Sequence, residues 1–373
     1  MPLSYVKQAI LFPRLICLAS ICLFLSSPAH ALETVFITGY VTTSGSDTNS
    51  VVLKSIDNGL NWSLQGTVLN LKETTSVTAV STENYFAVGG SAGLSPAGYT
   101  FSTTGGTQIL SSGLLKSVDA ASGTYYAAGN TADGSSGTIL KSTDGTNWTT
   151  QVSSGSKLNG ISASDSSVAY AVGDNGTVQK TTNGGTNWSS QTTDSNYVLY
   201  GVDTINATTA YAVGKNGNHG VILKTTDGTN WITTQTVSDT PLNAVSVTPD
   251  DPNVAFAVGD GSAILQTTDG TTWSDSDSGF STFGGGALSS IYAVSSTKAY
   301  AVGVIGSVAK LDGTSWVDIS ANIPAEYRGY NFTGVSVFTA IPIPEPSTII
   351  LSVVAVSVLA IIQRTRRSAP KPV

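Results

Sequence analysis

Cysteine, histidine and charged residues are scarce in this chain of 373 residues. It contains 2 cysteines and 2 histidines, and only 11% of its residues are charged. Both cysteines, Cys17 and Cys22, lie in the first 31 residues, which we expect to be removed, so the remaining chain has no disulfide and no cysteine-based metal site. A Ser-His-Asp triad would have to use His219, and nothing near it in the sequence supports that geometry. We predict no cofactor and no resident metal.

Arginine and positive charge are also scarce. Between Leu32 and Pro346 the only arginine is Arg328, and this stretch holds 11 basic and 24 acidic residues, a net charge of −13. Such a body repels nucleic acid and anionic membranes. Nucleic acid is therefore excluded as a partner.

Residues 1–31 have the features of a signal peptide. Lys7 and Arg14 give a basic start, LICLASICLFLSS (15–27) is an apolar stretch too short to span a bilayer, and a small-x-small cleavage site ends at Ala31. We expect an exported protein whose mature chain begins at Leu32.

Residues 341–373 form a second distinct segment. A Pro-Glu-Pro motif (344–346) precedes an apolar run over 347–362, and a basic end follows over 364–373. Sixteen mostly apolar residues are near the lower limit for a transmembrane helix, and arginines after them favour a cytoplasmic end. The residues that define this segment are Pro344, Glu345, Pro346, Arg364, Arg366 and Arg367.

This C-terminal segment resembles the PEP-CTERM sorting signal of Gram-negative bacteria. The resemblance implies that an exosortase-type protease is a partner and cleaves near the Pro-Glu-Pro motif. The helix would then be a transient inner-membrane anchor, and the protein would reach the cell surface or the exterior. A cleaved or a retained tail is compatible with the sequence.

A unit of about 40 residues repeats between the two ends. Trp148, Trp188, Trp231, Trp273 and Trp316 are 40, 43, 42 and 43 residues apart. Trp62 lies 86 residues before Trp148, and GYTFSTTGGTQIL (98–110) is an intervening copy without a tryptophan. A period of 40 to 45 residues with alternating apolar positions and frequent glycine is typical of β-propeller blades.

Each unit divides into four short strand-like runs, clearest at 158–164, 168–174, 176–183 and 187–192. NFTGVSVF (331–338) matches a first strand, and its three partners are found at 35–41, 50–59 and 61–65. We therefore predict an all-β fold over 32–340: a seven-bladed β-propeller of four-stranded antiparallel blades, with one blade closed by N- and C-terminal strands.

A Ser-x-Asp-x-Gly-x-x-Trp pattern precedes the last strand of the units. It runs from Ser55 to Trp62 and, with asparagine in the aspartate place, from Thr181 to Trp188; other copies are one residue shorter. This pattern resembles the Asp-box, or BNR repeat, of sialidase-like propellers, and the whole unit is similar to the photosystem II stability and assembly factors. The residues concerned are Asp57, Trp62, Asp144, Trp148, Asn183, Trp188, Asp227, Trp231, Asp269, Trp273, Asp312 and Trp316.

The repeated acids are interpreted as turn caps, because one copy per blade spreads them around a ring and does not bring them together. A sialidase needs three arginines, and the assembly factors have an arginine patch; this body has Arg328 alone. We predict that the protein is not an enzyme. A glycoside hydrolase built from paired carboxylates stays open as an alternative, because the separations of the acids are unknown.

Two irregular segments are candidate binding sites. NIPAEYRGYNF (322–332) concentrates Glu326, Tyr327, Arg328 and Tyr330, which could hold a ligand or only bridge to the closing strand. Asp275 and Asp277 alternate as in calcium loops but lack the further acids of an EF-hand, so weak metal binding there stays open.

The leading functional hypothesis is a secreted or cell-surface, non-enzymatic propeller that binds extracellular polysaccharide or a surface protein. The alternative is a chaperone-like assembly factor, favoured by the similarity of the repeat unit. An undetected glycoside hydrolase is the third hypothesis. In a four-stranded meander the links of most variable length open on one face, and we expect any ligand there.

Overall fold

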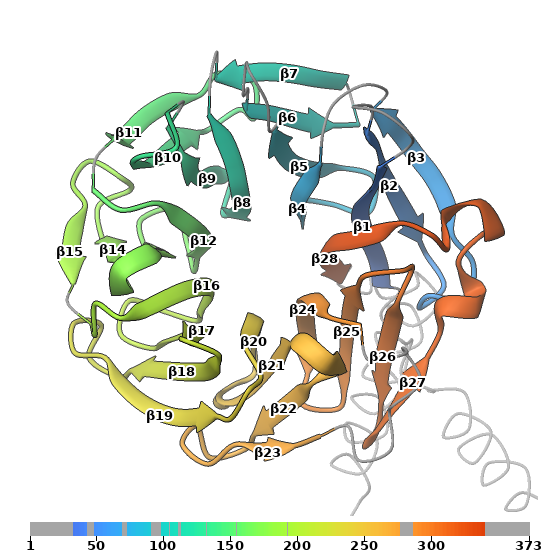
Figure 1. The fold of residues 1–373 in the computed structure, drawn as a ribbon. Coiled ribbons are helices and arrows are strands. Elements are labelled where there is room, and N and C mark those ends of the chain that lie inside the picture. The colour runs from blue at the N-terminus through green and yellow to red at the C-terminus, as the bar shows by residue number, and fades with distance from the viewer. Residues whose placement is uncertain are drawn as a thin grey trace, which may run out of the picture. The chain divides into compact units, whose positions relative to one another are not determined.

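The structure is a computed structural model that describes residues 33–42, 48–68, 73–90, 98–103, 105–110, 113–131, 133–153, 155–191, 193–276 and 286–339. Residues Glu33–Thr339 form one compact unit of antiparallel four-stranded sheets, which are arranged radially around a central channel (Figure 1). The predicted signal peptide (1–31) and sorting segment (341–373) lie outside the described residues.

The strands follow one order in every sheet, from the channel outward. The first, innermost strands are β4 (Thr74–Ala79), β8 (Leu114–Ala121), β12 (Leu158–Ala163), β16 (Tyr197–Thr204), β20 (Leu242–Thr248), β24 (Leu288–Ser295) and β28 (Asn331–Thr339). The second strands are β5 (Tyr85–Gly90), β9 (Thr124–Asn130), β13 (Ala169–Gly173), β17 (Ala210–Asn216), β21 (Asp251–Gly259), β25 (Lys298–Gly303) and β1 (Glu33–Thr42). The third strands are β6 (Gly98–Ser102), β10 (Gly137–Ser142), β14 (Val178–Thr181), β18 (His219–Thr225), β22 (Ile264–Thr267), β26 (Val308–Asp312) and β2 (Thr48–Ser55). The outer strands are β7 (Gly105–Leu110), β11 (Thr149–Ser153), β15 (Ser189–Gln191), β19 (Ile232–Val237), β23 (Ser274–Asp275), β27 (Ser315–Asp318) and β3 (Ser63–Val68).

A glycine near the end of each second strand of the consecutive-strand blades lies against a bulge in the first strand. The pairing of β12 with β13 shifts register between Leu158 and Gly160, which brings the Lys157 carbonyl oxygen onto Gly173. The φ of Gly173 is −170°, an extended conformation open to any residue, so the requirement for glycine is space. The corresponding glycines are Gly89, Gly129, Gly214, Gly259 and Gly303.

Aromatic pairs join neighbouring blades. The ring of Trp188 meets that of Tyr126, one blade earlier, edge-on with centroids 6.0 Å apart. Trp–aromatic pairs of this geometry add to the free energy gained by burying the rings, because the positive edge of one ring faces the negative face of the other. The equivalent pairs are Tyr170 with Trp231, Tyr211 with Trp273, and Phe256 with Trp316.

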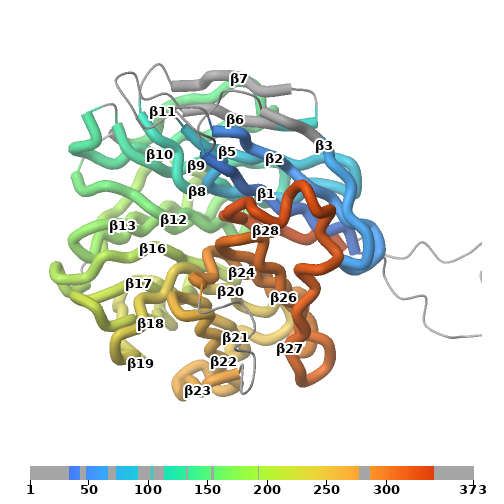
Figure 2. The backbone as a smooth tube through the Cα atoms, turned by 45° about the vertical axis from the view of Figure 1, so that its right-hand side comes forward, coloured from blue at the N-terminus to red at the C-terminus, as the bar shows by residue number. Residues whose placement is uncertain are grey.

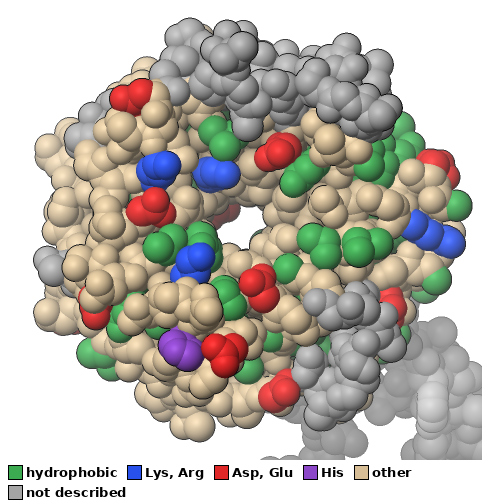
Figure 3. All heavy atoms as spheres, in the orientation of Figure 1, with side chains coloured by type: hydrophobic (Ala, Val, Ile, Leu, Met, Phe, Trp, Pro, Cys, Tyr) green, Lys and Arg blue, Asp and Glu red, His purple; other side chains and the backbone are tan. Residues whose placement is uncertain are grey.

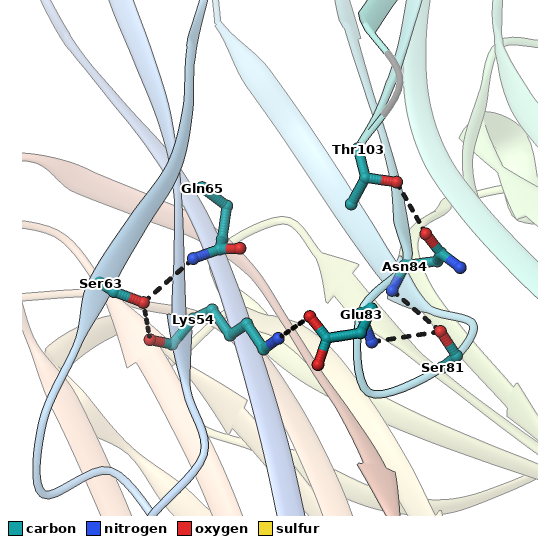
Figure 4. Close-up of polar contacts among 7 residues, drawn as sticks. All are labelled: Lys54, Ser63, Gln65, Ser81, Glu83, Asn84 and Thr103. Carbon is teal, nitrogen blue, oxygen red and sulfur yellow. Dashed lines mark hydrogen bonds and ion pairs between the residues drawn. The ribbon is translucent and has the colours of Figure 1, made fainter.

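Lysines on the third strands also reach into the next blade. Lys180 Nζ donates to the carbonyl oxygens of Ala207 (2.6 Å) and Gly228 (2.9 Å) and lies over the Tyr170 ring. Lys54 pairs with Glu83 at 2.7 Å across another blade boundary, and Figure 4 shows this contact between β2 and the turn after β4. These lysines are nearly buried, so each covers apolar surface with its stem while its ammonium group satisfies polar atoms of the neighbour.

One sheet joins the two ends of the unit. Strand β28 pairs with β1 from Glu33 opposite Thr339 to Tyr40 opposite Asn331, and the two strands lie side by side in both Figure 1 and Figure 2. Glu33 is only 3% exposed. Its carboxylate accepts hydrogen bonds from Lys298 Nζ at 2.9 Å and from the Tyr300 hydroxyl at 3.2 Å. This ion pair fixes the composite sheet to the blade of β24–β27.

The predicted fold class requires a correction. The structure is an all-β propeller, but blades made of four consecutive strands number six and not seven. The remaining four-stranded sheet is composite, because the unit begins with a second strand, β1, and ends with a first strand, β28. The fold class also included a transmembrane helix over 347–362, which lies outside the described residues; within the ranges described, no helix is long and apolar enough to span a membrane.

Candidate functional site

The innermost strands surround a cavity of about 550 Å³ along the channel axis. Most of its lining comes from the first strands of all the sheets, and Figure 3 shows its mouth as the central opening. The face in that view carries the short 3-10 helices η1 (Asp174–Gly176) and η2 (Asp260–Ser262), which belong to links between second and third strands. Links between second and third strands open on the face where the sequence predicts any ligand.

One ring of polar side chains occupies equivalent positions on the innermost strands, next to a buried β-branched residue. Its members are Thr78, Asp119, Ser162, Asp203, Ser246, Tyr292 and Ser336. We call this set the polar ring.

Most members of the polar ring accept a hydrogen bond from the innermost strand of the next sheet. Ser162 Oγ accepts from the N–H of Thr204 (3.3 Å), and Ser246 Oγ accepts from that of Ala293 (3.0 Å). Asp119 does the same with the N–H of Ala163, at 2.9 Å. Further bonds of this type run from Val247 to Asp203 and from Ala79 to Ser336. The polar ring therefore connects blades whose strand edges would otherwise face the channel unpaired.

The two carboxylates of the polar ring have unusual electrostatics. Burial raises the pKa of Asp119 to about 6, the N–H of Ala163 opposes this rise, and the charge of Asp203 adds to it. Burial likewise raises the pKa of Asp203, against hydrogen bonds from Val247, Ser162 and Thr204. Burial, and to a smaller extent the charges of Asp119 and Asp203, raise the pKa of the Tyr292 phenol. None of the ion pairs in the described ranges involves either carboxylate.

These pKa shifts predict that the protein becomes more stable as the pH falls from 7.5 to 5. Folding raises the pKa of Asp119 above its unfolded value near 4, so in this window the folded state binds the extra proton. The expected gain in the free energy of unfolding is about 1 kcal/mol from Asp119 alone. Chemical denaturation at both pH values would measure it.

Asp119→Ser tests the origin of this gain, because serine at the same ring position in other blades keeps the bond to the next strand. The variant is expected to fold and to lose most of the pH-dependent gain. An unchanged pH dependence would contradict the assignment. Below about pH 4 the trend reverses, since capping carboxylates such as Asp133, whose pKa hydrogen bonds from Ser135 lower to about 2, begin to lose their bonds.

A second set of side chains surrounds the mouth of the channel, nearer the face with η1 and η2. Lys116 is partly buried there, and burial lowers its pKa, opposed by the charge of Glu73. Lys215 Nζ lies 5.7 Å from the centre of the Tyr200 ring. The cavity lining at this level comprises Tyr40, Glu73, Thr75, Lys116, Asn159, Tyr200, Asn243, Ser289 and Thr333.

The residues of the repeated turn pattern lie far from the channel, near the outer strands. Asp57 Oδ1 accepts from the N–H of Asn61 (2.9 Å), and Ser55 Oγ accepts from that of Gly59 (2.9 Å). The shorter copies use the same contacts: Asp144 accepts from the N–H groups of Asn147 and Thr146, which lower its pKa. Equivalent bonds are accepted by Asn183, Asp227 and Asp269.

Asp312 departs from this pattern. It ends β26 in a tight hairpin with β27 and accepts from Lys310 Nζ at 3.4 Å. The tryptophans that follow these turns pack between blades, and Trp62 belongs to the apolar cluster around Tyr300. The structure thus brings none of the turn acids together in one site.

The segment around Arg328 belongs to the link that leads into β28. The Arg328 guanidinium donates to the carbonyl oxygens of Ile323 (2.8 Å) and Ala321 (2.7 Å). Tyr327 and Tyr330 form an edge-on pair and pack on the apolar cluster of the composite sheet, while Glu326 is exposed. Arg328 therefore has a bridging role, and a ligand site here remains a prediction.

The other candidates are dispersed. His219 is exposed in β18 and accepts the N–H of Asp239 at 3.3 Å. Asp275 lies in β23, and Asp277 is outside the described residues, as are Ala31 and the sorting residues of the C-terminal segment. In the described part of the chain, no three His, Cys, Asp or Glu side chains are grouped so that they could hold a metal.

Sequence reasoning missed Lys116, and it missed Asp119 and Asp203 although a signal for these two was present. When the first-strand runs are aligned, Asp119 and Asp203 share the position that Ser162 occupies after a small and a β-branched residue. A polar residue at one fixed position of every innermost strand marks the channel side of a propeller.

No family model matches the sequence, and no curated protein matches it. Among solved structures, YCF48 bound to D1 peptide is similar at 16% identity, over 77% of this chain and 99% of that chain, with a TM-score of 0.52. YCF48 from Cyanidioschyzon merolae is 15% identical over 76% of this chain and 97% of that one, with a TM-score of 0.51. The GH74 enzyme of Niastella koreensis is 15% identical over 77% of this chain but only 54% of its own length, with a TM-score of 0.50. At such low identity these similarities establish one conclusion, that the chain has a β-propeller fold.

Proposed function

We propose that this protein is a non-catalytic binding propeller, exported to the cell exterior, that holds an extracellular polysaccharide or protein at the channel mouth. The observation that carries the proposal is the 550 Å³ cavity whose rim combines lysine, tyrosine and amide side chains from several blades. Such a concave site with a few convergent polar groups is the usual form of a binding site.

Export and sorting are part of this proposal and depend on the two terminal segments. We infer a signal peptide that ends at Ala31 and an exosortase-type protease that recognises the segment with Pro344, Glu345 and Pro346. Cell fractionation with and without the sorting protease tests this step. Retention of the protein in the cytoplasm of both strains would contradict it.

The absence of catalysis is inferred from what the channel carboxylates do. Asp119 and Asp203 each use both oxygens to accept backbone N–H groups, at positions where serine makes equivalent bonds in other blades. A general acid or base must present its oxygen to a substrate proton. We therefore infer that these two acids stabilise the propeller and do not act on a substrate.

A glycoside hydrolase is the second candidate, because the raised pKa of Asp119 suits a general acid and a GH74 enzyme has a similar fold. An assembly factor is a further candidate, supported by the fold similarity to YCF48 bound to D1 peptide.

Incubation with a panel of polysaccharides separates binding from hydrolysis. We expect retention of a polymer or of a defined surface protein and no release of reducing ends. Turnover that disappears in both Asp119→Ser and Asp203→Ser would overturn the non-catalytic proposal.

A further inference from the structure

Most basic side chains in the described ranges are already bound to other protein groups. Lys116, Lys157 and Lys215 differ, because none of them forms an ion pair or donates to a backbone carbonyl there. The other basic side chains form hydrogen bonds or ion pairs, which join Lys54 with Glu83, Lys141 with Gly184, Lys180 with Gly228, Lys224 with Asn253, Lys298 with Glu33, Lys310 with Asp312, and Arg328 with Ile323.

Of the three lysines, Lys116 lies at the channel mouth, and the other two are linked to it by electrostatic interactions. Lys116 lines the cavity. The charge of Lys157 acts on Lys116, and the charge of Asp174 acts on both Lys116 and Lys215. Figure 3 shows Lys and Arg side chains beside the central opening. Among the described residues, the three lysines without an ion pair or a bond to a carbonyl oxygen therefore lie near one cavity, and of these Lys215 donates a hydrogen bond to the Tyr200 side chain.

Two acids near the mouth have side-chain partners, and a third, Glu73, lines the cavity and acts on Lys116 through its charge. Asp174 accepts from the Asn159 side chain (3.0 Å), and Asp260 accepts from that of Asn243 (3.1 Å). A lysine ammonium has three N–H donors, so the mouth presents unused donors together with the ring of Tyr200. The missing partner is a ligand rich in acceptors and negative charge.

We propose that the channel mouth binds the carboxylates of an acidic polysaccharide, with Lys116 and Lys215 as charge partners and Tyr200 as the surface on which a sugar ring stacks. This inference rests on the proposed binding function and specifies the chemical class of its ligand. The hydroxyl and amide groups of Thr75, Asn159, Asn243 and Ser289 suit the hydroxyls of neighbouring sugars.

A peptide fits this site less well. Peptides are held by strand addition to a free sheet edge or by apolar grooves. Here the edges are occupied: the N–H of Ala163 is bonded to Asp119, and the Leu199 carbonyl accepts from Asn159. The aliphatic lining residues, such as Val118 (4% exposed) and Val77 (5%), are buried between blades and form no groove.

The test measures binding of the purified full chain to polygalacturonate, to its methyl-esterified form and to polyglutamate. We expect binding of polygalacturonate that weakens at high salt, and weak or no binding of the ester, which has the same sugar without the charge. The double variant Lys116→Gln/Lys215→Gln should bind at least about tenfold more weakly, a loss of about 1.4 kcal/mol. Lys310→Gln, which removes a lysine of β26 away from the cavity, should bind normally.

Neither Lys116 nor Lys215 forms an ion pair within the described protein, so the double variant, which loses the contact of Lys215 with Tyr200, should unfold close to the temperature of the parent. Equal polygalacturonate binding by the double variant, or tighter binding of polyglutamate, would refute the inference. Binding of neutral glycans alone would refute it too but leave the proposed function standing. If the protein retains nothing from the glycan and surface-protein panels, both this inference and the proposed binding function fail.

Discussion

Gly173→Ala is expected to lower the free energy of unfolding by about 3 kcal/mol or more. An added Cβ would meet the carbonyl oxygen of Lys157 and the Cα of Leu158, which are backbone atoms of the paired strand and cannot rotate away. Relief requires β12 and β13 to separate at the bulge, which breaks ladder bonds in the centre of a blade. Urea unfolding of the parent and variant measures the loss.

Gly329→Ala is the matched control, since a Cβ at Gly329 has no atom within 4 Å. It should change stability by less than about 0.5 kcal/mol. If Gly173→Ala were as harmless as this control, the close approach of the two strands would not be what selects glycine.

Glu33→Ala is expected to cost about 2 to 4 kcal/mol. The substitution removes a buried carboxylate side chain, 4% exposed, and leaves the fully buried Tyr300 and the Lys298 ammonium without their shared acceptor. Removal of one partner of a buried pair is costly because the other charge stays desolvated. Thermal unfolding gives the loss, and limited proteolysis should show faster cleavage in the composite sheet.

Asp312→Ala provides the comparison, because it also removes the acid of a lysine pair. The Asp312 side chain is 69% exposed, so this variant should lose no more than about 0.5 kcal/mol. Equal losses in the two variants would show that Glu33 contributes no more than a surface ion pair.

The all-β propeller with four strands per unit could be predicted because the local patterns agree with the fold. The repeated Ala-Tyr-Ala-Val-Gly run gives a second strand, and Trp188 marks the outer strand of the same unit. These features depend on nearest neighbours along the chain. The same patterns did not show that Tyr170 and Lys180 both contact Ala207 of the following blade, because those contacts cross 37 and 27 residues of sequence.

The channel site was much harder to predict. Lys116 and Tyr200 are unremarkable in their own strands, and their meaning comes from the radial arrangement, which brings residues 84 positions apart to one mouth. The segment with Arg328 attracted attention by its composition, yet its guanidinium is used by carbonyls of its own link. Composition identifies unusual residues, but the pairing of each charge decides which are available to a ligand.

The composite sheet also sets when this chain can fold. Strand β1 needs β28 as its partner, and nearly the whole domain lies between them, so the ring stays open until its last strand has been synthesised. Such long-range pairing makes folding slow. A ring that cannot close early leaves the chain extended for longer, and this delay is compatible with the export proposed above.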